Sequence, residues 1–118
     1  MTTGFRVETE ELENGIHEIQ VAGELDAATL QDLEGPLTAA IDAGADAVLV
    51  NLSDCAFIDS TGLGLLMDAR EQITDGADRR FTICCPHDQV RKLLEMTGVD
   101  RVVELHATRD EALDSLRR

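Results

Sequence analysis

The chain has 118 residues, of which 43% are hydrophobic and 29% charged, a composition typical of a single globular domain. Only 3% of the residues are aromatic, with no Trp and no Tyr, which argues against base stacking as a mode of recognition. The formal net charge of −14 argues against nucleic acids and anionic membranes as partners, because both attract positively charged proteins.

The acidic residues are concentrated in the first part of the chain. Residues 1–69 contain 14 acidic residues and one Arg, whereas residues 70–118 contain 10 acidic and nine basic residues. Two explanations fit this asymmetry. It keeps the protein soluble, or it steers the protein toward a basic protein partner. Composition alone leaves both open.

The three cysteines, Cys55, Cys84 and Cys85, have neither the number nor the spacing of a disulfide framework. Adjacent residues of a strand point to opposite faces, so we do not expect Cys84 and Cys85 to form a metal pair. Small buried thiols in a reducing compartment are the expectation. The first residues lack an apolar signal core, and no segment approaches the roughly 18 apolar residues of a membrane span. We therefore expect a cytoplasmic protein.

The first predicted elements are two strands joined by a tight turn. Residues 5–11 alternate weakly between polar and apolar positions, and residues 16–21 alternate clearly. Asn14-Gly15 between them is a strong hairpin signal and is too short for a parallel crossover. The first strand is therefore expected to be antiparallel to the second, which we expect to end at residues 23–26.

Residues 27–43 then show the apolar spacing of a helix. Asp26 is a candidate N-cap, Gly44 is a natural stop, and Gly35-Pro36 predicts a kink or a restart within the helix. Residues 47–52 follow as an apolar run of strand length, of the kind that is buried on both faces of a parallel sheet.

The second half of the chain continues to alternate between helix and strand. The elements expected there are a helix from Ser60 to near Gly76, a strand at 81–85, a helix at 90–97, a strand at 102–105 and a helix capped by Thr108 with Glu111. The order β-β-α-β-α-β-α-β-α predicts a single α/β domain with a mixed, mostly parallel sheet. The order of the strands within the sheet does not follow from this pattern.

The segment that is most informative about function is residues 48–64, where a buried strand leads into a helix that opens with Ser60-Thr61-Gly62-Leu63-Gly64. In open α/β sheets, such strand-to-helix junctions often carry binding sites. The plain structural role of Ser60 is to cap the helix by accepting a first-turn N–H. Gly62 and Gly64 each cost about 1 kcal/mol relative to alanine. They therefore indicate either close packing of the helix on the sheet or access of a second macromolecule to Ser60.

Other kinds of site fit these residues less well. A nucleophile elbow needs glycine two residues before its serine, where this chain has Ile58, and no histidine is near in sequence, so a Ser60 hydrolase is disfavoured. Asp54 and Asp59 have the position of phospho-acceptors, but a turn or capping role is the more common one for such residues. We find no phosphate-binding loop and no metal-ligand spacing, and we expect no cofactor and no metal.

Several segments together resemble the STAS domain of bacterial anti-sigma-factor antagonists. The most specific segment is Phe57-Ile58-Asp59-Ser60-Thr61-Gly62-Leu63-Gly64. Supporting matches follow the same order along the chain: residues 23–26, 50–52, 90–98 and 110–113. Because the resemblance extends over nearly the whole chain, we identify residues 1–118 as one STAS domain. The family fold is a central sheet with helices packed mainly on one face.

The resemblance implies a switch that binds another protein, not an enzyme. Such antagonists bind a cognate anti-sigma factor, usually a serine kinase, and thereby free a sigma factor for transcription. The kinase phosphorylates the serine that matches Ser60, which ends the complex, and a serine phosphatase restores it. The alternative is a STAS interaction subunit of a transporter or signalling scaffold that has no phosphorylation cycle. The oligomeric state and the identity of the sigma factor are not implied.

The partner surface implied by the resemblance lies around Ser60 and the neighbouring Asp26 loop. Its expected residues are Asp26, Asp59, Ser60, Thr61, Gly62 and Gly64. Ser60 would accept the phosphate, Asp59 and Thr61 would shape the loop, and the glycines would give access. A phosphate at a helix N-terminus meets free N–H groups, so we expect the phosphorylated protein to stay folded.

Overall fold

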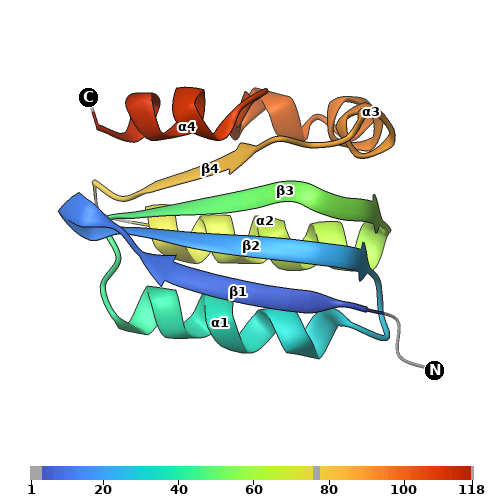
Figure 1. Cartoon of the computed structure of the whole chain (residues 1–118), viewed down its shortest axis with the longest axis horizontal. Coiled ribbons are helices and arrows are strands. Elements are labelled where there is room, and N and C mark those ends of the chain that lie inside the picture. The colour runs from blue at the N-terminus through green and yellow to red at the C-terminus, as the bar shows by residue number, and fades with distance from the viewer. Residues whose placement is uncertain (1–3, 76–77, 118) are drawn as a thin grey trace.

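The architecture is a five-stranded sheet with four helices, seen in a computed structural model that describes residues 4–75 and 78–117. The strands lie in the order β1-β2-β3-β4-β5; β1 is antiparallel to β2 and the other pairs are parallel. This confirms the predicted α/β class. The elements are β1 (Arg6–Glu11), β2 (Ile16–Leu25), α1 (Leu30–Asp42), β3 (Ala47–Ile58), α2 (Ser60–Thr74), β4 (Arg80–Cys84), α3 (Asp88–Met96), β5 (Glu104–His106) and α4 (Arg109–Leu116) (Figure 1).

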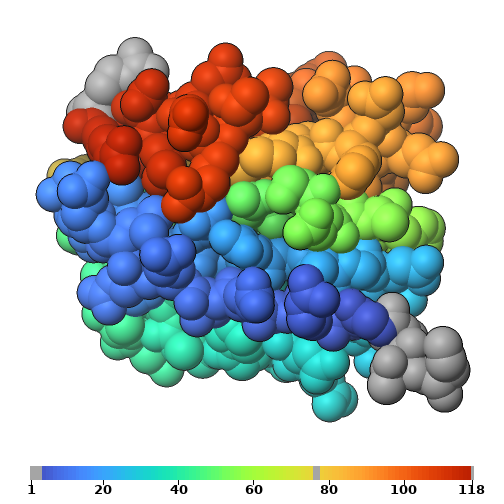
Figure 2. Space-filling view, viewed as in Figure 1, coloured from blue at the N-terminus to red at the C-terminus, as the bar shows by residue number. Residues whose placement is uncertain are grey.

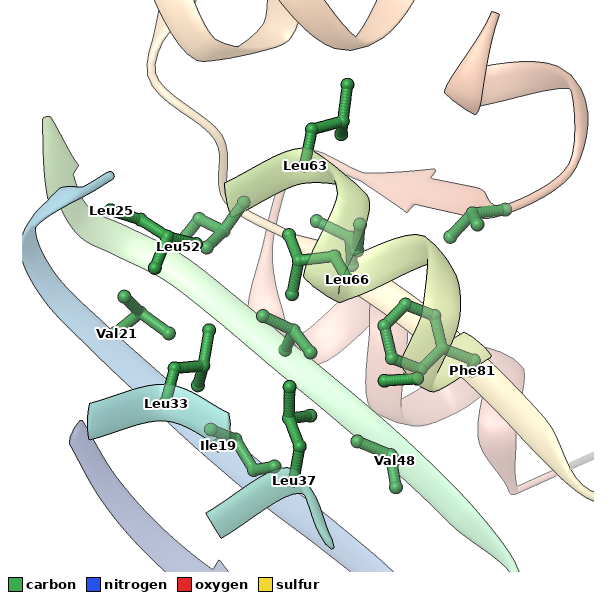
Figure 3. Packing of buried hydrophobic residues seen from close by; sticks show 14 of the residues in the cluster. Ile19, Val21, Leu25, Leu33, Leu37, Val48, Leu52, Leu63, Leu66 and Phe81 are labelled. Atoms are coloured by element: carbon green, nitrogen blue, oxygen red, sulfur yellow. The ribbon is translucent and has the colours of Figure 1, made fainter. Parts of the chain in front are cut away.

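The helices cover the two faces of the sheet unequally. On one face, Val48 and Val50 of β3 enter a large core that they share with α1, α2 and α3 (Figure 3). On the other face, Ala47 and Leu49 pack against α4. This division follows from the alternation of side chains along a strand. This confirms the prediction that helices pack mainly on one face. On the α4 face, residues of β1 and β2 form much of the surface seen in Figure 2.

The hairpin between β1 and β2 forms at Asn14-Gly15, as predicted. Both residues have positive φ, 63° and 72°, a conformation that asparagine and glycine adopt more readily than other residues. The second strand was predicted over residues 16–21 with a break at residues 23–26, but β2 continues through Gly23 and ends at Leu25. Gly23 lies inside β2 with φ 102°, and the register with β3 shifts on either side of it. The extra residues at these shifts belong to β3, which advances from Asn51 to Asp54 while β2 advances from Gln20 to Ala22, so the bulges lie in β3 and β2 continues through the glycine.

Helix α1 begins later than predicted and is not interrupted. Its N-cap is Thr29, and Asp26 lies in the turn before the helix. The helix continues through Pro36, where the predicted kink or restart would have divided it. Proline removes only its own N–H bond, while Leu33 and Leu37 stay buried against the sheet. Gly44, with φ 76°, follows the end of the helix as predicted.

Strand β3 extends to Ile58, well beyond the predicted end at Leu52. Its second half is paired with β2 alone, because β4 pairs with β3 only as far as Asn51. Strands β2 and β3 therefore project together past the end of β4 (Figure 1). Their carboxyl ends carry the Asp26 loop and the Ser60 loop, so this two-stranded projection positions the candidate site.

The later elements agree closely with the prediction. Helix α2 ends at Thr74, and Gly76, its predicted limit, lies outside the described residues. The last strand begins at Glu104 instead of residue 102, because a short 3₁₀ turn over Val99–Arg101 precedes it. Thr108 caps α4 as predicted, since its hydroxyl oxygen accepts the Glu111 N–H at 3.1 Å.

Cys84 and Cys85 contradict the prediction that their side chains point to opposite faces. Cys84 is the last residue of β4, and Cys85 follows it with φ 67°. This left-handed conformation ends the alternation of the strand and turns the second side chain back toward the first. The two Sγ atoms are 2.8 Å apart.

Among the described residues, no helix is long and apolar enough to cross a membrane.

Candidate functional site

Helix α2 is capped by Asp59, so Ser60 is not needed as the cap. Asp59 has extended backbone angles, and its Oδ1 accepts the N–H of Gly62 at 3.0 Å. Its carbonyl oxygen accepts the first intrahelical bond, from Leu63 N at 3.0 Å. The capping role that the sequence left open for Ser60 therefore belongs to Asp59, and Ser60 occupies the first helical position.

The side chain of Ser60 is exposed and is not used by the fold. Within residues 4–75 and 78–117, no hydrogen bond of its hydroxyl is found. Thr61 beside it is exposed as well. The Asp59 cap takes the N–H of Gly62, which leaves the N–H groups of Ser60 and Thr61 at the positive end of the helix dipole. An anionic group on Ser60 would thus have donors close to it.

The two glycines of the motif serve different purposes. Gly62 is buried, and a Cβ atom there would lie 2.6 Å from Leu25 Cγ and 2.9 Å from the Leu25 carbonyl oxygen. Of the two explanations that the sequence allowed, close packing on the sheet accounts for Gly62. Gly64 is exposed, and a Cβ atom there would meet nothing within 4 Å. Packing therefore does not explain Gly64.

Asp26 organises the loop after β2 through backbone hydrogen bonds. Its Oδ1 accepts the N–H groups of Ala28 at 3.0 Å and Thr29 at 3.2 Å. The hydroxyl of Thr29, a buried residue, donates to the carbonyl of Glu24 at 2.7 Å. The Asp26 carboxylate is half-buried and fixed in direction. Thr29 was not among the predicted residues, although Asp followed three residues later by Thr is a usual turn-forming pattern.

The Asp26 loop and the Ser60 loop are joined at the end of the sheet. The N–H of Asp59 donates to the carbonyl of Leu25 at 3.2 Å, directly before Asp26 in the chain. The same Leu25 packs against Gly62. These two contacts hold the Asp26 loop and the Ser60 loop next to each other at the end of the sheet.

A hydrophobic surface beside the Ser60 loop was not predicted from the sequence. The side chain of Phe57 is 46% exposed, an unusual state for one of only three phenylalanines in the chain. It borders a hollow of about 220 Å³ between the end of β3 and α3. The residues lining this hollow are Ala56, Phe57, Ile58, Gln89, Val90 and Leu93. The only sequence signal is the lack of alternation at Ala56-Phe57, before the strand turns into the loop.

The site lacks the partners of a hydrolase nucleophile. No hydrogen bond among the described residues joins a histidine to Ser60. The polar contacts of the histidines are His17 with Glu11, His87 with the backbone carbonyl of Ser53, and His106 with Glu104. The described residues also hold no cluster of three or more His, Cys, Asp or Glu side chains arranged for a metal ion.

Comparison with known proteins identifies the family. The model of the STAS domain family matches residues 7–112, nearly the whole of the fold described above. The chain belongs to the STAS domain family. The motif Asp59-Ser60-Thr61-Gly62 lies within this match, so the capped helix and its exposed serine are part of the STAS domain.

Two similar proteins are named for their role in sigma-factor regulation. The anti-sigma-B factor antagonist of Staphylococcus aureus (strain NCTC 8325) is 32% identical over 90 residues, which are 76% of this chain and 82% of the relative. An anti-sigma factor antagonist from Mycobacterium paratuberculosis has a similar crystal structure, with a TM-score of 0.90 and 26% identity over 100% of this chain and 98% of that one.

A third similar protein has been solved in two states. The unphosphorylated form of the anti-sigma factor antagonist SpoIIAA has a TM-score of 0.79 and 26% identity, over 95% of this chain and 96% of that one. The phosphorylated form of SpoIIAA from Bacillus has a TM-score of 0.73 and 24% identity, over 94% of this chain and 99% of that one, a likeness that shows the fold alone.

Proposed function

We propose that this STAS domain is an anti-sigma-factor antagonist, which binds an anti-sigma factor that is a serine kinase and is released when the kinase phosphorylates Ser60. The observation that carries this proposal is the free, exposed hydroxyl of Ser60 at the first position of α2, next to a cap supplied by Asp59. The names of the similar proteins support it, since all three are anti-sigma factor antagonists.

Phosphorylation would act at the surface and leave the fold intact. A phosphate on Ser60 adds about −1.5 to −2 charges and three acceptor oxygens. The helix N-terminus offers N–H groups to these oxygens, while the cap bond from Gly62 N to Asp59 stays in place. The added charge lies beside the carboxylate of Asp59, so a partner that fits the unmodified surface meets both new bulk and stronger negative potential. A serine phosphatase can reach the exposed phosphate and reset the switch.

The partner surface is proposed to combine a polar centre with a hydrophobic border. Asp26, Asp59 and Thr61 would surround Ser60, and Gly64 would let the partner approach the helix closely. Gly62 would contribute through the fold, by holding α2 against Leu25. At this border, the hollow beside Phe57 would accept an apolar side chain of the kinase. The acidic first half of the chain would draw in a kinase with a basic face.

Phosphorylation is tested with a candidate anti-sigma serine kinase from the same organism, chosen from the genes near this one. The protein is incubated with this kinase and ATP, and its intact mass is measured. We expect a gain of about 80 Da, one phosphoryl group, in the wild type and none in Ser60→Ala. Thr61→Ala is the matched control, since it removes the neighbouring exposed hydroxyl, and it should still gain the group. Failure of the wild type to react would favour a STAS interaction subunit without a phosphorylation cycle. Modification of Ser60→Ala would place the phosphate on another residue and contradict the role of Ser60.

Release is tested separately by a binding titration against the same kinase. Ser60→Asp, which imitates part of the phosphate charge, should bind at least tenfold more weakly than the wild type. Ser60→Ala should bind within a few-fold of the wild type, because the hydroxyl has no structural role. Equal affinity of Ser60→Asp and the wild type would contradict the proposed mechanism.

A further inference from the structure

The most unusual backbone in the described part of the chain, outside the glycines and the Asn14 turn, is at Cys85. Its φ of 67° lies in the left-handed region, which residues other than glycine and asparagine seldom occupy. The conformation is held by a hydrogen bond from Cys85 N to the carbonyl of His106 at 2.8 Å. Backbone strain that the surrounding structure maintains is often associated with function.

The consequence of this backbone is a pair of facing thiols. The Sγ atoms of Cys84 and Cys85 are 2.8 Å apart, compared with about 2.05 Å in a disulfide. Both side chains lie on the α4 face of the sheet, where Cys84 packs against Leu49 and Leu113. On an ordinary strand the two thiols would lie on opposite faces and could not meet.

The two cysteines differ in their access to solvent. Cys84 is fully buried, whereas Cys85 is half-buried. Burial raises the pKa of the Cys84 thiol, and the facing Cys85 thiol raises it further. A small oxidant therefore meets Cys85 first, with Cys84 already in position behind it. Cys55, the third cysteine, is buried in the main core and its thiol donates to the carbonyl of Phe57.

We propose that Cys84 and Cys85 form an oxidation site, which hydrogen peroxide converts to a disulfide between adjacent residues. In the first step the Cys85 sulfur attacks a peroxide oxygen; the S–O bond forms, the O–O bond breaks, and the departing hydroxide takes the thiol proton and leaves as water. In the second step the Cys84 sulfur attacks the resulting sulfenic acid; the S–S bond forms, the S–O bond breaks, and hydroxide leaves with the Cys84 proton as a second water. Two electrons pass from the thiols to the peroxide.

The disulfide is expected to be readily reversible. Consecutive Cα atoms across a trans peptide are about 3.8 Å apart, below the usual separation of about 4.4–6.8 Å in disulfides. The ring is therefore strained, and strained disulfides are the ones that cellular thiols reduce easily. A site of this kind fits a protein in a reducing compartment, where it would close only under oxidative stress.

The proposal is tested by peroxide titration of the full chain, followed by intact mass measurement. We expect a loss of two hydrogens, about 2 Da, which dithiothreitol reverses. Cys55→Ser is the matched control and should show the same loss. Cys85→Ser should not lose the two hydrogens. A wild type that stays reduced, forms only covalent dimers or gains only oxygen atoms at these residues would overturn the proposal, and so would a two-hydrogen loss that persists in Cys85→Ser.

A second probe does not depend on any variant. Phenylarsine oxide binds two close thiols at once, so one phenylarsenic group should bind per reduced chain and none after peroxide treatment. Prior binding should also protect both cysteines from alkylation, as peptide mapping would show. Independent alkylation of Cys85 in the presence of the arsenical would contradict the paired geometry.

Discussion

Gly62 lies so close to Leu25 that no larger residue fits between α2 and the end of β2. The Cβ of an alanine at 62 would lie 2.6 Å from Leu25 Cγ, and the backbone carbonyl of Leu25 at 2.9 Å leaves it no space to move. Gly64, one half-turn later, faces open space. Packing therefore requires glycine at position 62 but not at position 64. Substituting each glycine in turn can show this difference.

Replacing each glycine with alanine should change stability in opposite directions. Gly64→Ala should raise the free energy of unfolding by up to about 1 kcal/mol, because alanine is the better helix former and meets no obstacle. Gly62→Ala gains the same propensity but should still lower the free energy of unfolding, by about 1–3 kcal/mol, because of overpacking against Leu25. Urea unfolding of both variants measures the difference. Equal effects at the two positions would contradict the packing described here.

The cap of α2 should depend on Asp59 and not on Ser60. Asp59→Ala should cost about 1 kcal/mol, since the Gly62 N–H loses its acceptor. Asp59→Asn keeps a capping oxygen and should restore most of this stability. Ser60→Ala should leave the thermal midpoint nearly unchanged. A loss for Ser60→Ala as large as that for Asp59→Ala would show that the serine is the cap, and the free hydroxyl on which the proposed function depends would not exist.

Breaking the ion pair between the buried Glu18 and the half-buried Arg109 should cost more stability than breaking a pair whose carboxylate is exposed. Glu18 on β2 is fully buried, and Arg109, the first residue of α4, donates to its carboxylate from Nε and Nη2 at 2.9–3.0 Å. Asn51 Nδ2 donates to the same carboxylate at 3.0 Å. Burial raises the pKa of Glu18, but these hydrogen bonds outweigh burial and hold the pKa below its ordinary value.

Arg109→Ala should therefore lower the free energy of unfolding by about 3 kcal/mol, because an unpaired carboxylate is left buried. The matched control is Arg117→Ala, which breaks an exposed pair with Glu13 of 3.0 Å and should cost less than about 1 kcal/mol. Chemical unfolding measures both losses. Similar small losses would indicate that water replaces the guanidinium at Glu18 without cost.

Glu104 should make the protein less stable in acid. A hydrogen bond from Ser115 and another from Arg80 lower the pKa of Glu104 from 4.5 to about 2. A carboxyl group whose pKa is lower in the folded state stabilises the fold above its unfolded pKa, and that contribution is lost as pH falls from 4.5 toward 2. Glu104→Gln should flatten the dependence of unfolding free energy on pH in this range. Glu34→Gln, an exposed glutamate of α1, should follow the wild type.

Local sequence signals predicted the kinds of elements and their order, and they failed where pairing between distant segments decided the outcome. Asn14-Gly15 and the Thr108 cap depend on neighbouring residues, and both were predicted. The extension of β3 to Ile58 depends on pairing with β2. No local pattern in the polar stretch Ser53-Asp54 predicts this pairing. The same cause hid the continuation of β2 through Gly23, because a glycine in this position resembles a strand end until the partner strand is known.

The sequence predicted which residues belong to the candidate site, but it did not predict which of them caps the helix and which stays free. The motif around Ser60 indicated a helix start, yet either Asp59 or Ser60 could supply the cap, and only the backbone angles decide between them. The facing thiols of Cys84 and Cys85 depend on one positive φ angle in a residue type that rarely adopts it. The exposure of Phe57 depends on where α3 lies, which is a matter of tertiary packing.

The exposed ring of Phe57 also makes the molecule convenient to observe. Because the chain has no Trp and no Tyr, it contributes almost no intrinsic fluorescence of its own. A tryptophan substituted at Phe57 would be the sole fluorophore, half in water and bordering the surface proposed for the kinase. Its emission would move to shorter wavelength on docking and return on release, so the cycle of the switch could be followed in real time without a label.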